Sequence, residues 1–227
     1  MNLSIIIPSY NEGKTLPQVI EKINSAQIKS SYEIIIVDDG SRDNTRQILK
    51  KYQKVKKIKI IVNRQNLGKG SSIIKALAKS TGDIILIQDA DLEYDPNDIP
   101  KLLEPFKKST VQVVYGSRIL GKNVVSHWTF YIGGRLLTLL TNLLYRTNIT
   151  DEPTGYKIFR SKIIRSLKLR SKGFEFCPEI TAKIAKRGIK IEEVPISYQP
   201  RKISEKKIRW YDGLKAIYYL IKYRISD

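Results

Sequence analysis

Residues 83–91, with the sequence DIILIQDAD, join an apolar run to a pair of aspartates. The run at 83–87 is rich in isoleucine and leucine, which is typical of a strand buried on both faces of a sheet. Asp89 and Asp91 follow directly after it. In an open parallel sheet, ligands bind beyond the carboxyl ends of the strands. The segment therefore predicts a parallel sheet with a binding site at the edge where the two aspartates lie.

Three further apolar runs precede this segment, at residues 3–8, 33–37 and 58–62. The stretches between them carry apolar residues at the spacing of one helix face. Because strands and helices alternate, the sequence predicts an α/β fold with a mainly parallel central sheet flanked by helices. The helical residues are Leu16, Val19, Ile20 and Ile23, then Ile48, Leu49 and Tyr52, then Ile73, Ile74, Leu77 and Ala78.

The alternation loosens in the second half of the chain, where further elements are nevertheless expected. Strands are predicted at 111–115, 155–159 and 189–197, and helices near 161–167 and 178–186. No internal repeat or linker-like segment interrupts the sequence, so we expect a single domain over residues 1–227. Two more predicted helices have an apolar stripe, which consists of Leu136, Leu139, Leu140 and Leu143 in one and of Leu214, Ile217, Tyr218 and Ile221 in the other.

The composition is strongly basic, with 41 Lys and Arg against 22 Asp and Glu and a formal net charge of +19. This excess favours anionic partners, which include nucleic acid, an acidic membrane surface and phosphorylated substrates. Cys177 is the only cysteine, so no intramolecular disulfide can form. The N-terminus has no signal-peptide pattern, and the apolar stretches 136–144 and 216–221 are too short to cross a bilayer of about 30 Å. We therefore expect a cytoplasmic protein that does not span the membrane by itself.

Polar clusters follow each of the first four predicted strands, at residues 8–12 (PSYNE), 38–41 (DDGS), 63–70 (NRQNLGKG) and 89–91 (DAD). A single cluster of this kind is equally typical of a helix cap or a turn. Four clusters at one edge of a sheet favour a binding site instead. Two carboxylates one residue apart suit a hard divalent cation such as Mg²⁺, which prefers a few carboxylate oxygens together with phosphate and water.

The glycine-containing segment 66–70 (NLGKG) needs a separate interpretation. It lacks the spacing of an ATP-binding phosphate loop and the third glycine of a dinucleotide-binding loop, which argues against ATP and NAD. It predicts a glycine loop beside the bound substrate, with an ordinary turn as the alternative. His127 is the only histidine and has no cysteine or carboxylate at metal-ligand spacing, so we give it no catalytic role.

Taken in order, the motifs PSYNE at 8–12, VDDGSRDNT at 37–45, NLGKG at 66–70 and DADL at 89–92 resemble those of family 2 glycosyltransferases. The second half is similar to the polyprenyl-phosphate (dolichyl-phosphate) hexose synthases of that family. The similar motifs are GSR at 116–118, DEPTGYKIFR at 151–160, GFEF at 173–176, PEI at 178–180 and EVPISYQPR at 193–201.

This resemblance implies a GT-A type nucleotide-diphospho-sugar transferase fold that uses Mg²⁺ or Mn²⁺. It implies inverting transfer of a hexose from a GDP- or UDP-sugar to a dolichyl or undecaprenyl phosphate. Residues 1–118 would then bind the nucleotide sugar, 119–200 would form the acceptor half, and 201–227 would be a basic loop and an amphipathic helix. A saccharide or protein hydroxyl remains an alternative acceptor.

The resemblance also implies roles for individual residues. Glu93 would join Asp89 and Asp91 as a metal ligand, although a glutamine is common at this position in dolichyl-phosphate mannose synthases. The acceptor phosphate would be bound by Arg118 and Arg135. The donor nucleotide would be contacted by Pro8, Tyr10, Glu12, Val37 and Asp39, and its diphosphate by Asp89, Ala90, Asp91, Arg201 and Lys207.

A phosphate acceptor changes the catalytic requirement. The second pKa of a phosphate monoester is about 6, so the acceptor arrives as an oxyanion and no strong base is needed. The protein must position that oxyanion and neutralise the leaving diphosphate, which suits a metal with arginine and lysine donors. A hydroxyl acceptor would need a carboxylate base, for which Asp151 is the candidate; a turn-forming role before Pro153 is the equal alternative.

The C-terminal region, residues 201–224, interleaves cations with aromatic residues and an apolar stripe. This pattern favours peripheral association with the anionic inner face of the cell membrane, with or without a membrane-embedded partner protein. Packing of the stripe onto the domain or onto another subunit is the alternative. A non-enzymatic nucleic-acid-binding module would explain the basic tail, but the aspartates at 38, 39, 89 and 91 would repel a phosphate backbone. A nuclease or a phosphatase would more often add histidine or further carboxylate ligands.

Overall fold

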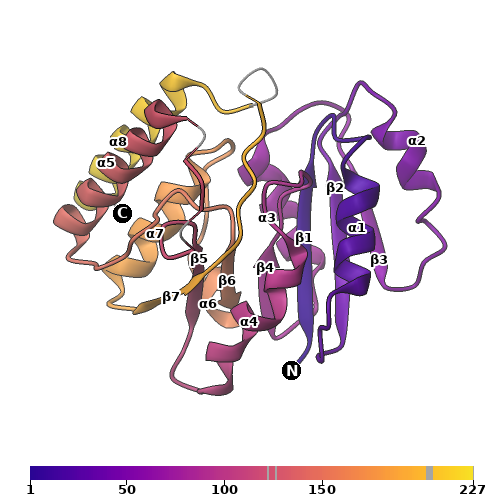
Figure 1. The fold of residues 1–227 in the computed structure, drawn as a ribbon, viewed down its shortest axis with the longest axis horizontal. Helices are drawn as coiled ribbons and strands as arrows, with labels where there is room; N and C mark the ends of the chain where they lie inside the picture. The colour runs from indigo at the N-terminus through magenta and orange to yellow at the C-terminus, as the bar shows by residue number, and fades with distance from the viewer. Residues whose placement is uncertain (122, 126, 203–206, 227) are drawn as a thin grey trace.

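The computed structural model describes residues 1–121, 123–125, 127–202 and 207–226. Its centre is a seven-stranded sheet in the order β3-β2-β1-β4-β6-β5-β7 (Figure 1). The α/β fold predicted from the alternation of strands and helices is confirmed. The strands are β1 (Leu3–Ser9), β2 (Tyr32–Asp38), β3 (Ile58–Val62), β4 (Ile84–Ile87), β5 (Val113–Ser117), β6 (Lys157–Arg160) and β7 (Ile191–Pro195).

Strand directions divide the sheet into two parts. β1 pairs in parallel with β2 and with β4, and β2 pairs in parallel with β3. β6 runs antiparallel to both β4 and β5, whereas β7 is parallel to β5. The sheet is therefore mainly parallel, as predicted, with one antiparallel strand at the junction. The carboxyl ends of β1 to β4 all lie at one edge, which is the edge expected to bind ligand.

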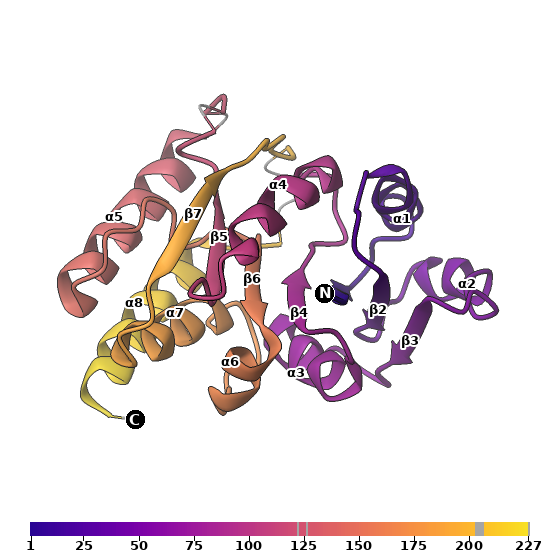
Figure 2. The ribbon, with the colours of Figure 1, turned by 90° about the horizontal axis from the view of Figure 1, so that it is seen from below.

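Helices cover both faces of the sheet (Figure 2). One hydrophobic cluster joins one face to α1 and α4, and the other joins the opposite face to α3, α6 and α7. Neighbouring residues of β1 show this division, because Ile5 belongs to the first cluster and Ile6 to the second. The helices are α1 (Leu16–Ser25), α2 (Thr45–Lys50), α3 (Lys69–Lys79), α4 (Ile99–Leu103), α5 (Trp128–Tyr145), α6 (Ser161–Ser166), α7 (Phe176–Lys186) and α8 (Trp210–Ile225).

The segment from Pro96 to Lys107 was not predicted to be helical. It contains α4 between two short 3-10 turns, η1 (Pro96–Asp98) and η2 (Glu104–Lys107). Its three prolines, at 96, 100 and 105, obscure a helical pattern in the sequence. Each lies near the start of a helical turn, where a missing N–H costs nothing.

α5 and α8 form an outer layer that packs on α7 through a small third cluster. The hydroxyl of Tyr145 donates to the carbonyl of Leu220 at 2.6 Å, which ties the two helices together. α5 buries Thr138 and Thr141 instead of its predicted leucine stripe. Their hydroxyls donate to carbonyls one turn back, at 2.8 and 2.9 Å, so the helix can bury them without an unpaired group.

Most residues of both predicted stripes therefore face outward, whereas Leu140 is partly buried against the third cluster. Leu136, Leu139 and Leu143 are 60%, 65% and 76% exposed. Leu214 and Tyr218 of α8 are also exposed. No described helix is both long enough and apolar enough to cross a membrane.

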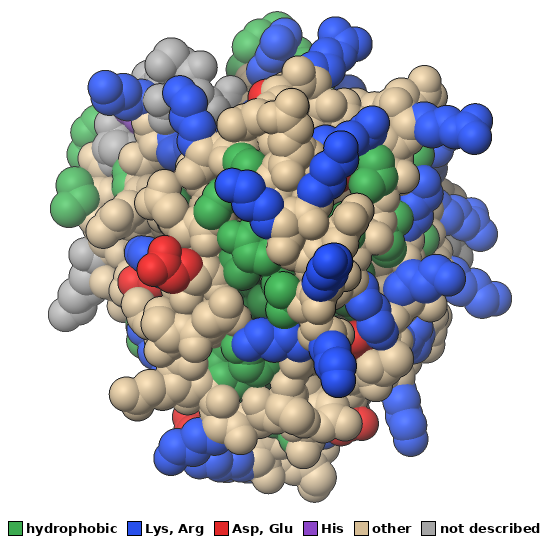
Figure 3. Space-filling model, turned by 90° about the vertical axis from the view of Figure 1, so that its right-hand side faces the viewer, with side chains coloured by type: hydrophobic (Ala, Val, Ile, Leu, Met, Phe, Trp, Pro, Cys, Tyr) green, Lys and Arg blue, Asp and Glu red, His purple; other side chains and the backbone are tan. Residues whose placement is uncertain are grey.

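The opposite end of the sheet is strongly basic. Figure 3 shows the side of the molecule that carries α2 and β3, where Lys and Arg side chains greatly outnumber acidic ones. β3 is an edge strand, and Lys59 on it pairs with Glu33 at 2.7 Å. Lysines along an edge strand oppose pairing with other chains. The exposed lysines here include Lys50, Lys51, Lys54, Lys56 and Lys59.

Candidate active site

The predicted edge of the sheet gathers acidic residues from β1 and β4 around the side chain of Arg201. Nη2 of Arg201 lies 2.7 Å from Oδ2 of Asp91, and Nη1 lies 3.1 Å from Oε1 of Glu12. Lys207 also reaches this group, with Nζ 2.7 Å from the same Glu12 oxygen and a second hydrogen bond to the carbonyl of Tyr10. Residues far apart in sequence and predicted to share one site are thus in direct contact. The basic loop that joins Arg201 to Lys207 includes residues 203–206, which lie outside the described residues.

Asp89 has a different cationic partner, which the sequence did not identify. Oδ1 of Asp89 lies 2.5 Å from Nζ of Lys69, at the start of α3. Lys69 is the lysine of the NLGKG loop, so its position between two glycines was the available signal. On the other side, a Cβ at Gly155 would lie only 2.4 Å from Oδ2 of Asp89. Glycine is therefore required at 155 to leave room for this carboxylate.

The electrostatics of the two aspartates suit a bound cation. Burial, and next the negative charge of Asp89, raise the pKa of Asp91 to about 7, although Arg201 opposes the shift. Two partly desolvated carboxylates that lie close together gain from a divalent cation between them. Mg²⁺ is usually held by one or two carboxylates together with substrate phosphates and water. Asp89 and Asp91 fit that requirement.

The third predicted metal ligand, Glu93, is engaged elsewhere. Its Oε1 accepts a hydrogen bond from the backbone N–H of Arg201 at 2.9 Å. Among the described residues, no three His, Cys, Asp or Glu side chains form a group that could hold a metal ion. Glu93 thus helps to hold the segment that carries Arg201, and its role as a metal ligand stays a prediction.

The predicted nucleoside residue Asp39 holds the glycine loop in place. Its carboxylate accepts hydrogen bonds from the backbone N–H of Leu67 at 3.0 Å and of Gly68 at 2.8 Å. Gly68 has φ of +96°, and a Cβ there would lie 2.4 Å from the carbonyl oxygen of Lys172. Both features require glycine at position 68. Asp39 thus fixes the loop that leads directly into Lys69.

The remaining predicted nucleoside residues occupy different environments. Pro8 and Val37 are partners in the parallel β1–β2 register, next to the strand ends. The side chain of Val37 is fully buried in the hydrophobic cluster around α3. Tyr10 is partly exposed beside Lys207, whose Nζ lies 5.8 Å from the ring centroid. Of these three, Val37 is enclosed by the core, whereas Pro8 and Tyr10 are partly exposed.

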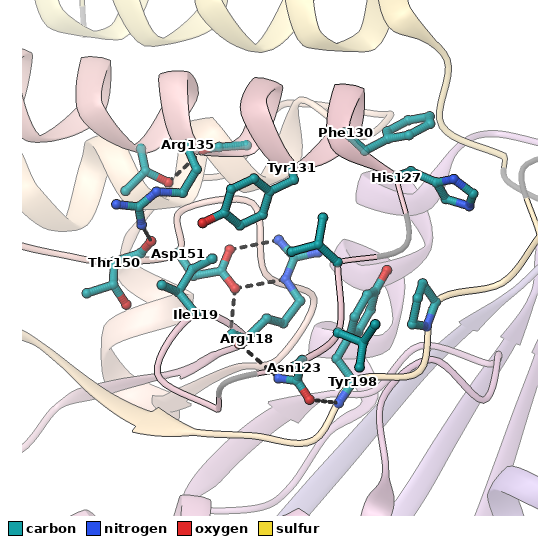
Figure 4. Close-up of a pocket in the computed structure, with 15 residues that line it drawn as sticks. Arg118, Ile119, Asn123, His127, Phe130, Tyr131, Arg135, Thr150, Asp151 and Tyr198 are labelled. Carbon is teal, nitrogen blue, oxygen red and sulfur yellow. Dashed lines mark hydrogen bonds and ion pairs between the residues drawn. The ribbon is translucent and has the colours of Figure 1, made fainter.

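A pocket of about 310 Å³ lies between α5 and the segments around 118 and 150 (Figure 4). Arg118 and Arg135, the two residues predicted to bind the acceptor phosphate, both line it. Nη1 of Arg135 donates to the carbonyl of Thr150 at 3.0 Å. Aromatic side chains, including Tyr131 and Tyr198, form other parts of the wall. The pocket therefore combines cationic and apolar surfaces.

The carboxylate of Asp151 forms an ion pair with Arg118. Its carboxylate accepts hydrogen bonds from Nε at 2.8 Å, from Nη2 at 2.7 Å and from the backbone N–H of Arg118 at 2.9 Å. Burial alone would raise the pKa of Asp151, but the charge and hydrogen bonds of Arg118 bring it below its ordinary value. A carboxylate held in this way is a weak base. The pairing favours a role in orienting Arg118 over the general-base role that a hydroxyl acceptor would require.

The acidic residues at the sheet edge and the pocket around Arg118 are connected by two tyrosines. The hydroxyl of Tyr94 accepts a hydrogen bond at 2.7 Å from the N–H of Gly155, the glycine next to Asp89. The Tyr94 ring lies 5.3 Å from that of Tyr198, and the guanidinium of Arg118 lies 5.1 Å from the Tyr198 ring. A short chain of contacts thus connects the carboxylate site, which is the Asp89 and Asp91 pair, to the pocket lined by Arg118 and Arg135, which we call the arginine pocket.

Sequence reasoning missed several residues of the pocket wall. His127, which received no role, lines the pocket together with Phe130 and Tyr131. Asn123 donates to the carbonyls of Arg118 and Ile196 at 2.8 and 2.7 Å, which joins two segments of the wall. No local motif surrounds these positions, because the pocket is assembled from separate segments.

Comparisons with known proteins are consistent with this architecture. The sequence profile described as "Glycosyl transferase family 2" matches residues 4–168. A dolichol-phosphate mannosyltransferase of Pyrococcus furiosus is 30% identical over 98% of this chain and 64% of its own length. A UDP-N-acetylglucosamine–dolichyl-phosphate N-acetylglucosaminyltransferase of Methanococcus voltae is 33% identical over 85% of this chain and 83% of its own. A low-salt glycan biosynthesis hexosyltransferase of Haloferax volcanii is 26% identical over 96% of this chain and 53% of its own. The chain thus spans between about half and two thirds of the Pyrococcus and Haloferax proteins.

Solved structures show the same fold. Glucosyl-3-phosphoglycerate synthase from Mycobacterium tuberculosis, in complex with Mn²⁺, UDP and glucosyl-3-phosphoglycerate, superposes with a TM-score of 0.76 at 20% identity. The match covers 100% of this chain and 81% of that one. The same enzyme in complex with phosphoglyceric acid gives a TM-score of 0.78 at 18% identity. At these identities the likeness concerns the fold alone.

Proposed function

The chain belongs to glycosyl transferase family 2, and we propose that it moves a hexose from a GDP- or UDP-sugar to a polyprenyl phosphate, with inversion at the anomeric carbon. One structural relationship carries this proposal. The carboxylates Asp89 and Asp91 and the arginine pocket are joined through Gly155, Tyr94 and Tyr198. A donor and a phosphate acceptor bound at these two places would therefore lie side by side.

At the donor side, Asp89 and Asp91 would hold Mg²⁺ or Mn²⁺, with Glu93 as a further candidate ligand. The cation, when bound, neutralises charge on the departing nucleoside diphosphate. Lys69, Arg201 and Lys207 already point their cationic groups at the acidic residues of this edge. They would add positive charge around the diphosphate, where charge develops as the leaving group departs.

The nucleoside would lie against Pro8, Tyr10, Glu12 and Asp39 near the ends of β1 and β2. Val37 would support this site from the core, because its side chain is fully buried. Asp39 would accept a hydrogen bond from an N–H or O–H group of the nucleoside. The Ala90 backbone accepts a hydrogen bond from the hydroxyl of Thr15 at 2.9 Å, which holds the segment between the two aspartates against α1.

At the acceptor side, Arg118 and Arg135 would bind the phosphate of the polyprenyl chain. This phosphate needs little help from a base, since its second pKa is about 6. One of its oxygens attacks the anomeric carbon as the bond from that carbon to the diphosphate oxygen breaks. Asp151 acts through Arg118, whose guanidinium it orients at two points. Attack on the side opposite the leaving group inverts the anomeric configuration.

The outer helices support peripheral membrane association. Trp128 at the start of α5 is 66% exposed and Trp210 at the start of α8 is 77% exposed. Most of the apolar stripe of each helix is exposed as well, and Lys215 and Lys222 of α8 add positive charge. An amphipathic helix with this composition binds at the headgroup layer of an anionic membrane. We propose that the single domain docks in this way on the cytoplasmic face, alone or with a membrane-embedded partner.

The experiment is a transfer assay with a panel of GDP- and UDP-sugars, Mg²⁺ or Mn²⁺ and a short polyprenyl phosphate in detergent. Asp91→Asn should abolish transfer, because it removes one metal ligand without changing the size of the side chain. Asp95→Asn is the matched control, since Asp95 caps the η1 turn and pairs with Lys22 at 3.7 Å. Equal activity of Asp91→Asn and the wild type would contradict the proposed metal site.

A further inference from the structure

Lys75 lies on α3, outside the set of residues assigned to the proposed site, and holds a buried amide. Its Nζ donates to Oδ1 of Asn63 at 2.6 Å. Asn63 follows β3 directly and is only 2% exposed. Its Nδ2 donates to Oδ1 of Asp39 at 2.7 Å. Lys75 is thus connected through the side chain of Asn63 to the carboxylate of Asp39, which is proposed to bind the nucleoside.

The orientation of the Asn63 amide is determined by its two partners. A lysine ammonium can only donate hydrogen bonds, and an ionised carboxylate can only accept them. The oxygen of Asn63 must therefore face Lys75, and the NH₂ group must face Asp39. The Asn63 backbone is also held, because its N–H donates to the carbonyl of Asp38 at 2.8 Å and its carbonyl accepts from Arg46 at 3.4 Å.

This amide shapes what Asp39 can offer a ligand. Oδ1 of Asp39 accepts from Asn63 and from the N–H of Leu67, while Oδ2 accepts from the N–H of Gly68. A carboxylate has about four acceptor positions, so about one remains, on Oδ2. The next residue in the loop is Lys69, which is paired with Asp89. The hydrogen bonds that begin at Lys75 therefore end at Gly68, the residue before Lys69.

We infer that Lys75 is a positioning residue for the nucleoside diphosphate, and that it acts without touching the nucleotide. By holding the Asn63 amide in one orientation, it keeps Asp39 and the glycine loop in the arrangement that binds the donor. This inference rests on the proposed donor site and adds a residue that no motif identifies. Its effect is confined to donor binding, because the hydrogen bond of Lys75 leads to Asn63 and Asp39 and not to the arginine pocket.

The test compares Lys75→Met with Lys79→Met, which removes an equivalent exposed lysine four residues further along the same helix. Binding of UDP and GDP with Mg²⁺ is measured by calorimetry. Loss of one hydrogen bond to a charged donor should weaken nucleotide binding about tenfold in Lys75→Met. The donor KM should rise by a similar factor, with kcat, the acceptor KM and the melting temperature unchanged. Lys79→Met should match the wild type, and Lys75→Arg should recover most of the affinity.

Hydrogen exchange gives a readout that needs no ligand. The amides of Leu67 and Gly68 should exchange faster in Lys75→Met than in the wild type or in Lys79→Met. Unchanged exchange and unchanged nucleotide affinity in Lys75→Met would overturn the inference, as would a fall in kcat and melting temperature with no change in donor KM. A wild-type protein that binds neither UDP nor GDP would overturn the proposed function itself, and the inference with it.

Discussion

Arg118 and Asp151 form a two-point ion pair in the wall of the arginine pocket, with Nε–Oδ2 and Nη2–Oδ1 distances of 2.8 and 2.7 Å. The Asp151 side chain is only 3% exposed. A planar guanidinium that is held at two points cannot rotate freely, so its remaining N–H groups keep a fixed direction. We expect this fixed direction to hold the phosphate of the proposed acceptor in place for in-line attack.

Asp151→Asn should separate the positioning role from a base role. The substitution keeps the shape of the side chain but removes the charge that orients Arg118. We expect a loss of about tenfold to a hundredfold in kcat/KM for the acceptor with the donor KM unchanged. Steady-state kinetics across pH provide the measurement. Loss of a pH-dependent limb in the kcat profile of the variant would instead identify Asp151 as a general base.

Gly155→Ala should damage the metal site. The added Cβ would lie 2.4 Å from Oδ2 of Asp89 and 2.8 Å from the Tyr94 ring, so one of them must move. We expect the apparent Kd for Mn²⁺ to rise at least tenfold, which titration of activity with metal will measure. Gly213→Ala is the control, because a Cβ added there would meet no described atom within 4 Å. Similar metal dependence in both variants would show that Asp89 is not a ligand.

Glu33 should contribute stability that disappears in acid. Burial alone would raise its pKa, but hydrogen bonds from Lys59, Ser4 and Thr81 lower it from 4.5 to about 2. A carboxylate with a depressed folded-state pKa stabilises the fold above pH 4.5 and loses that contribution as the pH falls toward 2. Glu33→Gln should therefore cost about 1 kcal/mol at pH 7, after allowance for solvent screening, and much less near pH 2.5. Urea unfolding at the two pH values measures this difference; an equal cost at both would contradict it.

The outward leucine stripe should bind lipid. A Leu139→Glu, Leu143→Glu double variant places two charges on a face where both leucines are more than half exposed. We expect its affinity for vesicles containing phosphatidylglycerol to fall at least tenfold, because the insertion of apolar side chains is lost. Co-sedimentation measures this affinity. Val62→Glu is the control, since Val62 is exposed at the opposite end of the sheet, on β3. Equal vesicle binding by the double variant and the wild type would assign this face to another partner.

Much of the fold could be predicted because each strand and helix leaves a pattern in a short, contiguous stretch of sequence. The β1 to β4 strands are mostly apolar runs, and Ile58–Val62 agrees with its prediction at both ends. The direction of β6 could not be predicted, because the choice between parallel and antiparallel pairing depends on how distant segments meet. The outward direction of the α5 stripe was also hidden. Thr138 and Thr141 can be buried only because their hydroxyls bond within the helix, and periodicity does not report this.

The candidate site also contains residues that the sequence could predict and residues that it could not. Residues within contiguous motifs, such as Asp89 and Asp91, could be predicted as site residues from their spacing and from their place after a strand. Lys69 and Lys75 could not, because their importance comes from partners supplied by other strands. Side-chain pairing across the site requires the three-dimensional arrangement.

The proposed phosphate acceptor can be tested by comparing two lipids that differ only in the phosphate group. The protein is incubated with Mg²⁺, the nucleotide sugar that it binds and either a polyprenyl phosphate or the matching polyprenol without phosphate, and the lipid products are analysed by mass spectrometry. We expect that only the polyprenyl phosphate gains one hexose, and that Arg118→Ala reduces this product at least a hundredfold. Equal glycosylation of the polyprenol, or no hexose on the phosphorylated lipid with any donor, would contradict it.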